Sequence, residues 1–322
     1  MKAALVTGPN QIPVYSDFRN PVAQVGQELI TVTASALSPV AKVMAAGSHY
    51  NSSGLFPRVV GIDGVGSTQS GRRIYFSMPQ APFGGMAEQT LVVAENCIPL
   101  PDNVEDVVAA AIANPALSSV AALKVRADLK AGETVLVNGA TGTAGKLAVQ
   151  LAKYMGARKV IATGRDSATL QQLKQLGADI TINLTDEQKN LEEAFGEQFG
   201  GDGVDIVLDY LFGDRAEPLL TTITRTSKGP KPLRYVVIGG VTGSQITLQS
   251  SVLRAVPIAI MGSGIGSVPW PSFMQAVSDV MQAVVPANLQ IATTVVPLST
   301  IEKSWNEDPG KSRVVFLTNE AR

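Results

Sequence analysis

A glycine-rich turn near the middle of the chain carries the residue types that bind a phosphate group. The apolar run 134–138 leads into Ala140, Gly142 and Gly145, which fit a G-x-G-x-x-G pattern with alanine in its first position, and an apolar-faced helix follows. Gly142 would let the backbone approach a pyrophosphate, Gly145 would let the helix pack on the strand, and free N–H groups at the helix start would bind the charge. The pattern predicts a dinucleotide-binding turn, and the alternative is a tight turn without a ligand. The predicted turn residues are Ala140, Thr141, Gly142, Thr143, Ala144 and Gly145.

The end of the second strand of this unit indicates which dinucleotide binds. The strand 160–163 ends at Gly164, where an NAD site would carry an acidic residue for the ribose hydroxyls, and Arg165 follows. Asp166 lies further on and, with Ser167, is typical of a helix cap. Arg165 therefore favours the 2′-phosphate of NADP(H), and its alternative is an ordinary exposed arginine.

Two later strand ends carry further candidates. Asp209 ends one apolar run, and Gly239 and Gly240 follow another. Ligands of an open parallel sheet bind beyond the carboxyl ends of its strands, so the two glycines would let the chain pass close to the nicotinamide half of the cofactor. Their alternative is a turn that needs positive φ. We expect Asp209 to be structural.

The elements around the turn alternate regularly between strand and helix. Short apolar runs followed by amphipathic segments indicate βαβ units, and hence a parallel sheet with helices on both faces. Strands are expected at 134–138, 159–163, 180–183, 204–209, 234–238 and 257–261, and helices at 145–155, 167–176, 186–199 and 214–224.

The two ends of the chain have a different pattern. The first 110 residues contain short β-branched runs between Gly and Pro turns, which predict a mostly antiparallel β domain. Two helix-like runs, 104–112 and 116–125, lie on either side of Pro115. The predicted fold is α/β, with a doubly wound parallel-sheet domain at 116–263 inserted into a domain formed by 1–115 and 264–322.

Composition excludes several classes of protein. The 322 residues include 26 Lys and Arg against 27 Asp and Glu, a net charge of −1 that offers no basic face for nucleic acid. Cys97 and His49 are the only residues of their types, so neither a disulfide nor a zinc cage of four Cys or His ligands can form. No apolar run approaches the ~18 residues of a membrane helix, and residues 1–6 are typical of a strand and not of a signal peptide. We expect a soluble, cytoplasmic protein.

Over nearly its whole length the chain resembles the zinc-free quinone oxidoreductase branch of the medium-chain dehydrogenase/reductase superfamily. The segments that carry the resemblance, besides the glycine-rich turn, are 38–40, 61–66, 115–119, 129–133, 177–179 and 311–316. Zinc alcohol dehydrogenases have Gly-His-Glu where this chain has Gly61, Ile62 and Asp63, and Ile62 cannot bind a metal.

The resemblance implies a Rossmann-type domain inserted into a GroES-like catalytic domain. It also implies metal-free transfer of hydride from NADPH to a quinone or an α,β-unsaturated carbonyl compound, and a homodimer formed through the edge strand 257–261. By the same resemblance, Arg313 is the candidate for a basic residue that contacts the pyrophosphate of the cofactor, and its alternative is a basic residue that merely flanks a strand.

The chain departs from this branch in its expected substrate pocket. The branch commonly has Asn-Pro followed by a tyrosine, whereas this chain has Ser38 and, at the tyrosine position, Val43. Tyr50 is the candidate hydrogen-bond donor to the substrate oxygen, with His49 and Lys42 as candidate helpers. Solvent could also supply the proton, and the loop pair could have no function. The other functions left open are reduction of an enoyl-thioester or alkenal double bond, and NADPH binding without turnover, as in a redox sensor or a lens-type structural protein.

Overall fold

The structure of the protein is a computed structural model, which describes residues 1–47, 54–201, 203–227, 231–307 and 310–318. The chain forms two compact units. Unit 1 contains Met1–Asn114, Val277–Pro286 and Gln290–Arg322, and unit 2 contains Pro115–Ala276 and Ala287–Leu289.

Unit 2 is built on a six-stranded sheet in which every pair of neighbours is parallel. The spatial order is β11-β10-β9-β12-β13-β14, which is the 3-2-1-4-5-6 order of a Rossmann-type fold. The strands are β9 (Thr134–Asn138), β10 (Lys159–Gly164), β11 (Ile180–Asn183), β12 (Ile206–Asp209), β13 (Leu233–Val237) and β14 (Ile258–Gly262). The predicted parallel sheet is confirmed.

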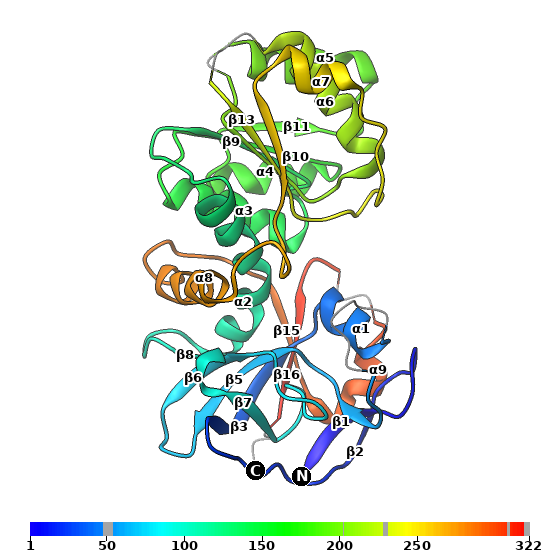
Figure 1. Ribbon diagram of the computed structural model, residues 1–322, viewed down its shortest axis with the longest axis vertical. Coiled ribbons are helices and arrows are strands. Elements are labelled where there is room, and N and C mark those ends of the chain that lie inside the picture. Colours follow the sequence, from blue (N-terminus) through cyan, green and yellow to red (C-terminus); the bar gives the residue numbers. More distant parts are fainter. Residues whose placement is uncertain (48–53, 202, 228–230, 308–309, 319–322) are drawn as a thin grey trace. The chain divides into compact units, whose positions relative to one another are not determined.

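Helices cover both faces of this sheet (Figure 1). In β9 the side chains of Val135 and Val137 belong to one apolar core, and Leu136 belongs to the other, because successive strand residues point to opposite faces. The first core is completed by α3 (Thr143–Tyr154) and α4 (Ser167–Gln175), and the second by α5 (Gln188–Gly200), α6 (Ala216–Thr226) and α7 (Ser250–Ala255). The turns that follow the strands therefore lie at the carboxyl edge of the sheet.

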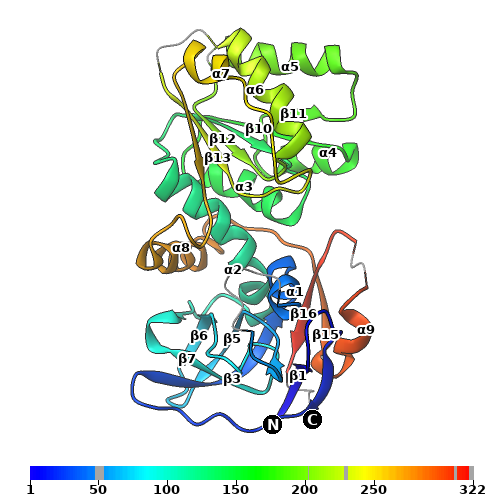
Figure 2. The ribbon, with the colours of Figure 1, turned by 45° about the vertical axis from the view of Figure 1, so that its right-hand side comes forward.

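Unit 1 contains two mostly antiparallel sheets (Figure 2). A three-stranded sheet has the order β2-β1-β4, and a larger one has the order β15-β16-β3-β5-β6-β8, with β7 paired to β3. Among the strand pairs described in this unit, only β15 and β16, near the end of the chain, are parallel. The strands are β1 (Lys2–Val6), β2 (Val14–Asp17), β3 (Gln27–Ala36), β4 (Arg58–Val59), β5 (Asp63–Thr68), β6 (Arg73–Ser77), β7 (Gln89–Val93), β8 (Cys97–Pro99), β15 (Thr293–Pro297) and β16 (Arg313–Leu317).

The expectation of two helical runs separated by Pro115 was wrong. Pro115 lies inside α2 (Asp106–Val120), and six residues of π-helix, Ala121–Arg126, continue it. Proline removes one helical hydrogen bond, but Ala113, Ala116 and Leu117 around it are at most 3% exposed. Their burial offsets the lost bond. The remaining helices are α1 (Pro39–Ala45), α8 (Trp270–Ala283) and α9 (Ile301–Ser304).

The same helical stretch corrects the sequence-based statement about membrane spans. Asp106–Arg126 is long and apolar enough to cross a membrane by length and composition. However, 72% of its apolar window is buried inside the protein, as in the core helix of a soluble protein. Among the residues that the structure describes, no other helix meets this test.

Candidate functional site

The glycine-rich turn joins β9 to α3 at the carboxyl end of the parallel sheet. Gly142 caps α3 with an extended conformation and provides no side chain for the first N–H groups of the helix. A β-carbon placed on Gly142 would meet nothing within 4 Å, so the backbone here faces open space. A β-carbon on Gly145 would lie 2.4 Å from the carbonyl oxygen of Gly139, so only glycine fits there. One glycine leaves room for a ligand and the other lets the helix pack.

The tight turn between β9 and the motif is made by Gly139, which sequence reasoning did not select. The residue with positive φ is Gly139, at +91°, and not Ala140. Ala140 is fully buried in the apolar core, and its N–H donates to the carbonyl oxygen of Thr163 over 2.7 Å. Gly139 was overlooked because Ala140 fits the motif spacing, whereas the tight turn needs the glycine one residue earlier.

A buried polar network ties the carboxyl ends of the strands beneath this turn. The Asn138 amide donates to Oδ1 of Asp209 over 2.9 Å and accepts from the Thr163 hydroxyl over 2.8 Å. The Tyr235 hydroxyl donates to Oδ2 of Asp209 over 2.6 Å. Burial raises the pKa of Tyr235 far above its usual value, and the charge of Asp209 raises it further. Every donor meets an acceptor, so the network fixes β9, β10, β12 and β13 relative to one another.

Gly164 and Arg165 lie beside the turn, at the end of β10. A β-carbon on Gly164 would come within 2.3 Å of Cγ2 of Thr141. Arg165 is exposed and forms no hydrogen bond or ion pair with any described residue. Asp166 caps α4 by accepting the N–H of Thr169 over 2.6 Å. An uncommitted guanidinium therefore lies where the ribose of a bound dinucleotide is expected.

Gly239 and Gly240 follow β13. The alternative for them, a turn that needs positive φ, was wrong, because neither has positive φ. Both positions need glycine because a side chain would collide with neighbouring backbone. A β-carbon on Gly239 would lie 2.6 Å from the carbonyl oxygen of Tyr210, and one on Gly240 would lie 2.9 Å from that of Gly243. The backbone segments that follow β12 and β13 therefore pack closely against each other at the carboxyl end of the sheet.

Tyr210, which sequence reasoning did not select, lies next to Asp209. Its hydroxyl is 2.8 Å from the Ser119 hydroxyl, and both residues are buried. Burial raises the pKa of Tyr210 to about 12, although hydrogen bonding with Ser119 and Ser118 lowers it in part. The group keeps its proton at neutral pH and is a poor general acid.

Arg313, the predicted pyrophosphate ligand, is buried in unit 1. It is 7% exposed and interacts electrostatically with Asp63, which is 1% exposed and accepts a hydrogen bond of 2.9 Å from the Tyr75 hydroxyl. Burial raises the pKa of Asp63 to about 6, against the charge of Arg313 and the bond from Tyr75. Burial also lowers the pKa of Arg313. Within the described chain, Oδ1 of Asp63 and the Nε and Nη2 atoms of Arg313 have no hydrogen-bond partner. The two side chains therefore interact through their charges without a hydrogen bond or ion pair between them among the described residues.

The candidate catalytic residues are only partly described. Lys42 lies on α1, with Nζ 5.9 Å from the centre of the Trp305 ring, a cation–π contact. His49 and Tyr50 lie outside the described residues. Ile62 is 8% exposed and offers no metal ligand. No group of three His, Cys, Asp or Glu that could hold a metal ion occurs among the residues that the structure describes.

Comparisons with known proteins agree with the fold. A family model described as zinc-binding dehydrogenase matches residues 144–282. A probable NADPH-dependent quinone reductase of Emericella nidulans is 28% identical over 98% of this chain and 100% of its own length. The quinone oxidoreductase of Homo sapiens is 30% identical, but the match covers 63% of each chain.

Solved structures extend the similarity to the whole chain. The quinone oxidoreductase of Thermus thermophilus has a TM-score of 0.80 at 25% identity, covering 98% of this chain and 100% of that one. A probable oxidoreductase from Mycobacterium abscessus has a TM-score of 0.77 at 26% identity, covering 98% and 99%. In its parallel sheet, its glycine-rich turn and its sequence, the chain is thus similar to quinone oxidoreductases of the medium-chain dehydrogenase/reductase superfamily.

Proposed function

We propose that the protein is an NADPH-dependent reductase that delivers a hydride to a quinone or to an α,β-unsaturated carbonyl compound, without a metal. The observation that carries the proposal is the open backbone at Gly142, at the start of a 12-residue helix on the carboxyl edge of a Rossmann-type sheet. Helix N-termini at this edge bind pyrophosphate through free N–H groups and the helix dipole. The names of the Emericella and human relatives support the activity.

The proposed cofactor site uses backbone more than side chains. Thr143 and Ala144 begin α3, and their N–H groups would hold the pyrophosphate, while Thr141 and Gly164 pack against each other beside it. Arg165 would pair with the 2′-phosphate. The chain at Gly239 and Gly240 would lie along the nicotinamide half. We leave Arg313 out of this set because its guanidinium is buried beside Asp63.

When bound, NADPH supplies the hydride, and the protein has to orient it and exclude side reactions. The buried network of Asn138, Thr163, Asp209 and Tyr235 keeps the strand ends rigid, so the groups above it stay in place. A quinone or enone that accepts hydride becomes a stabilised anion, which needs little acid help. Water is therefore the proposed proton source, with Tyr50, His49 and Lys42 as candidate contributors.

The side chains do not fit a catalytic zinc ion, although the matching family model is described as zinc-binding. Three protein ligands are usual in such sites, and the whole chain has one cysteine and one histidine. Burial raises the pKa of Cys97 to about 11, so its sulfur remains a thiol and a weak ligand. Ile62 has no donor atom at the position where zinc alcohol dehydrogenases carry histidine.

The direct test is initial-rate NADPH oxidation with a panel of quinones, enones, alkenals and enoyl thioesters, with and without a chelator. We expect turnover with quinones or enones, preference for NADPH over NADH, and no loss to the chelator. Turnover confined to alkenals would favour the second candidate, supported by a 30% identical NADPH-dependent alkenal/one oxidoreductase of Arabidopsis thaliana over 58% of this chain. NADPH binding without turnover of any acceptor would contradict the proposed enzyme and favour a cofactor-binding sensor.

We also propose a homodimer, formed through β14. This strand ends the spatial order of the six-stranded sheet, and Ala259 on it is exposed. An edge strand offers unpaired backbone groups to a second copy. Sedimentation equilibrium should give a mass of twice 33.7 kDa. A monomer at micromolar concentration would contradict the proposal.

A further inference from the structure

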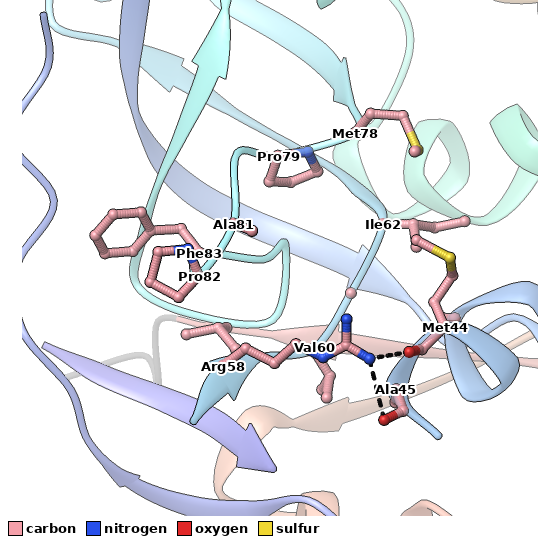
Figure 3. A pocket seen from close by; sticks show the side chains of 13 residues that line it. Met44, Ala45, Arg58, Val60, Ile62, Met78, Pro79, Ala81, Pro82 and Phe83 are labelled. Carbon is pink, nitrogen blue, oxygen red and sulfur yellow. Dashed lines mark hydrogen bonds between the residues drawn. The ribbon is translucent and has the colours of Figure 1, made fainter. Parts of the chain in front are cut away.

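A small cavity in unit 1 contains an arginine with no acidic partner among the described residues. The cavity encloses about 130 Å³ and lies between α1, β4 and the loop 78–83. Figure 3 shows Arg58 on one side, and Met78, Pro79, Ala81, Pro82 and Phe83 on the other. Apart from Arg58, its walls are apolar side chains and backbone.

The Arg58 guanidinium is held in place by the end of α1. Its Nη2 atom donates to the carbonyl oxygens of Met44 and Ala45, the second over 3.2 Å, and its carbon lies 5.1 Å from the centre of the Phe56 ring. Arginine at the last carbonyl groups of a helix is a favourable cap. The hydrogen bonds therefore explain the position of Nη2, but they do not balance the charge.

The rest of the guanidinium is uncommitted. Arg58 is 7% exposed, yet it forms no ion pair with any described acidic residue, and Nε and Nη1 donate to no described group. A buried cation costs free energy unless an anion or several hydrogen bonds compensate it. Burial accordingly lowers the pKa of Arg58. The cavity thus offers one positive charge with free N–H donors and apolar walls.

We propose that this cavity binds a small monocarboxylate whose apolar part is about the size of one six-membered ring. The carboxylate would accept from Nη1 or Nε of Arg58 and supply the missing negative charge. Its apolar part would lie against Ile62, Met78 and Pro82. A cavity of roughly 150 Å³ takes up benzene, so about 130 Å³ suits one ring or a short branched chain. This inference concerns unit 1 alone and does not depend on the proposed reductase activity.

A neutral carbonyl compound of the same shape is the main alternative, because one N–H donor can also serve a carbonyl oxygen. The charge of Arg58 decides between them. Hydrogen bonds between two ionised groups are roughly twice as strong as neutral ones, and here the ionised ligand also removes an unpaired buried charge. A benzoate ion should therefore bind more tightly than benzamide, which has nearly the same shape and no charge.

The experiment titrates the full-length protein with benzoate and with benzamide, without NADPH, by calorimetry. We expect saturable benzoate binding with one site per chain and at least tenfold weaker binding of benzamide. Arg58→Met should weaken benzoate binding at least tenfold, whereas Arg254→Met, which changes an exposed arginine on α7, should leave it unchanged.

A second variant keeps Arg58 intact in case its loss prevents folding. Ala81 is exposed and lines the cavity, so Ala81→Leu should fill the space and weaken benzoate binding at least tenfold. Ala23→Leu, at an exposed loop position, is the matched control. Absence of benzoate binding at millimolar concentration, or equal binding by Ala81→Leu and wild type, would overturn the proposed site. Equal binding of benzamide and benzoate would overturn its preference for an anion.

Discussion

Gly164 and Thr141 are in such close contact that a β-carbon on the glycine would lie 2.3 Å from Cγ2 of the threonine. The contact brings the end of β10 against the glycine-rich turn between β9 and α3. Arg165, the next residue, is consequently anchored beside the proposed pyrophosphate site, although its own side chain is exposed. The choice between NADPH and NADH would be made at this contact.

Replacing Arg165 by alanine should weaken NADPH binding and leave NADH binding nearly unchanged. A charge-assisted hydrogen bond to the 2′-phosphate contributes about 1–3 kcal/mol, which corresponds to roughly 5- to 150-fold in the dissociation constant. Fluorescence titration with both cofactors measures the two losses. Arg254→Ala is the control, since it removes an exposed arginine elsewhere in unit 2. Equal losses for NADPH and NADH would contradict the role of Arg165.

Gly142 and Gly145 should respond differently to alanine. Gly145→Ala places a β-carbon 2.4 Å from the carbonyl oxygen of Gly139, so we expect the free energy of unfolding to fall by about 1–3 kcal/mol. Gly142→Ala meets no atom within 4 Å and needs no positive φ, so the fold should keep its stability. Its methyl group should instead obstruct the cofactor and weaken NADPH binding at least tenfold.

Denaturant unfolding and NADPH titration of both variants test this contrast. Circular dichroism in the absence of NADPH ensures that stability is compared in the free protein. If Gly142→Ala bound NADPH like the wild type, the backbone there would not approach the cofactor. If Gly145→Ala were as stable as the wild type, the helix could move away from the turn at little cost.

The sequence predicted what depends on local pattern. Alternating apolar and amphipathic runs indicated β9 to β14, because each strand of a parallel sheet is buried on both faces and reads as a short apolar run. The helix cap at Asp166 was also local, since the carboxylate bonds to an N–H three residues later. Spacing selected Ala140 for the motif but did not show that Gly139, one residue earlier, makes the tight turn, because only the observed φ shows that.

Features that depend on distant segments were not predicted. Pro115 remains in a helix because buried neighbours compensate for its lost hydrogen bond, and burial is a property of the folded chain. Arg313 has the pattern of a basic strand residue, but β16 brings it within electrostatic range of Asp63 at the start of β5. Arg58 likewise gains its partners only when β4 reaches the end of α1. Such contacts carry no signature in either segment alone.

Tyr50→Phe should lower turnover on enones more than turnover on quinones. A quinone spreads the incoming charge over its ring, whereas an enolate concentrates the charge on one oxygen and gains more from a donor. One neutral hydrogen bond contributes about 0.5–1.5 kcal/mol, a few-fold to roughly tenfold effect, while general acid catalysis would give about 100-fold or more. The measurement compares kcat/KM for both acceptor classes at saturating NADPH. Unchanged values for every acceptor would leave Tyr50 without a catalytic role.

Buried Asp63 should make stability depend on pH in an unusual direction. Burial raises the pKa of Asp63 from 3.8 to about 6, so between these values the native state holds a proton that the unfolded chain has released. The free energy of unfolding contributed by this group is therefore greatest below about pH 4 and falls as the pH rises to about 6. Ordinary exposed carboxylates do not produce this decrease.

Asp63→Asn isolates the effect, because asparagine does not titrate. The free energy of unfolding of the wild type minus that of Asp63→Asn should fall by about 1–3 kcal/mol from pH 4 to pH 6.5 and then stay level. Asp186→Asn, at an exposed position, should show no such trend. Urea unfolding at half-unit pH steps gives both curves. A difference that stays constant or grows over this range would mean that Arg313 holds Asp63 ionised, since an opposite charge close enough to outweigh burial reverses the sign.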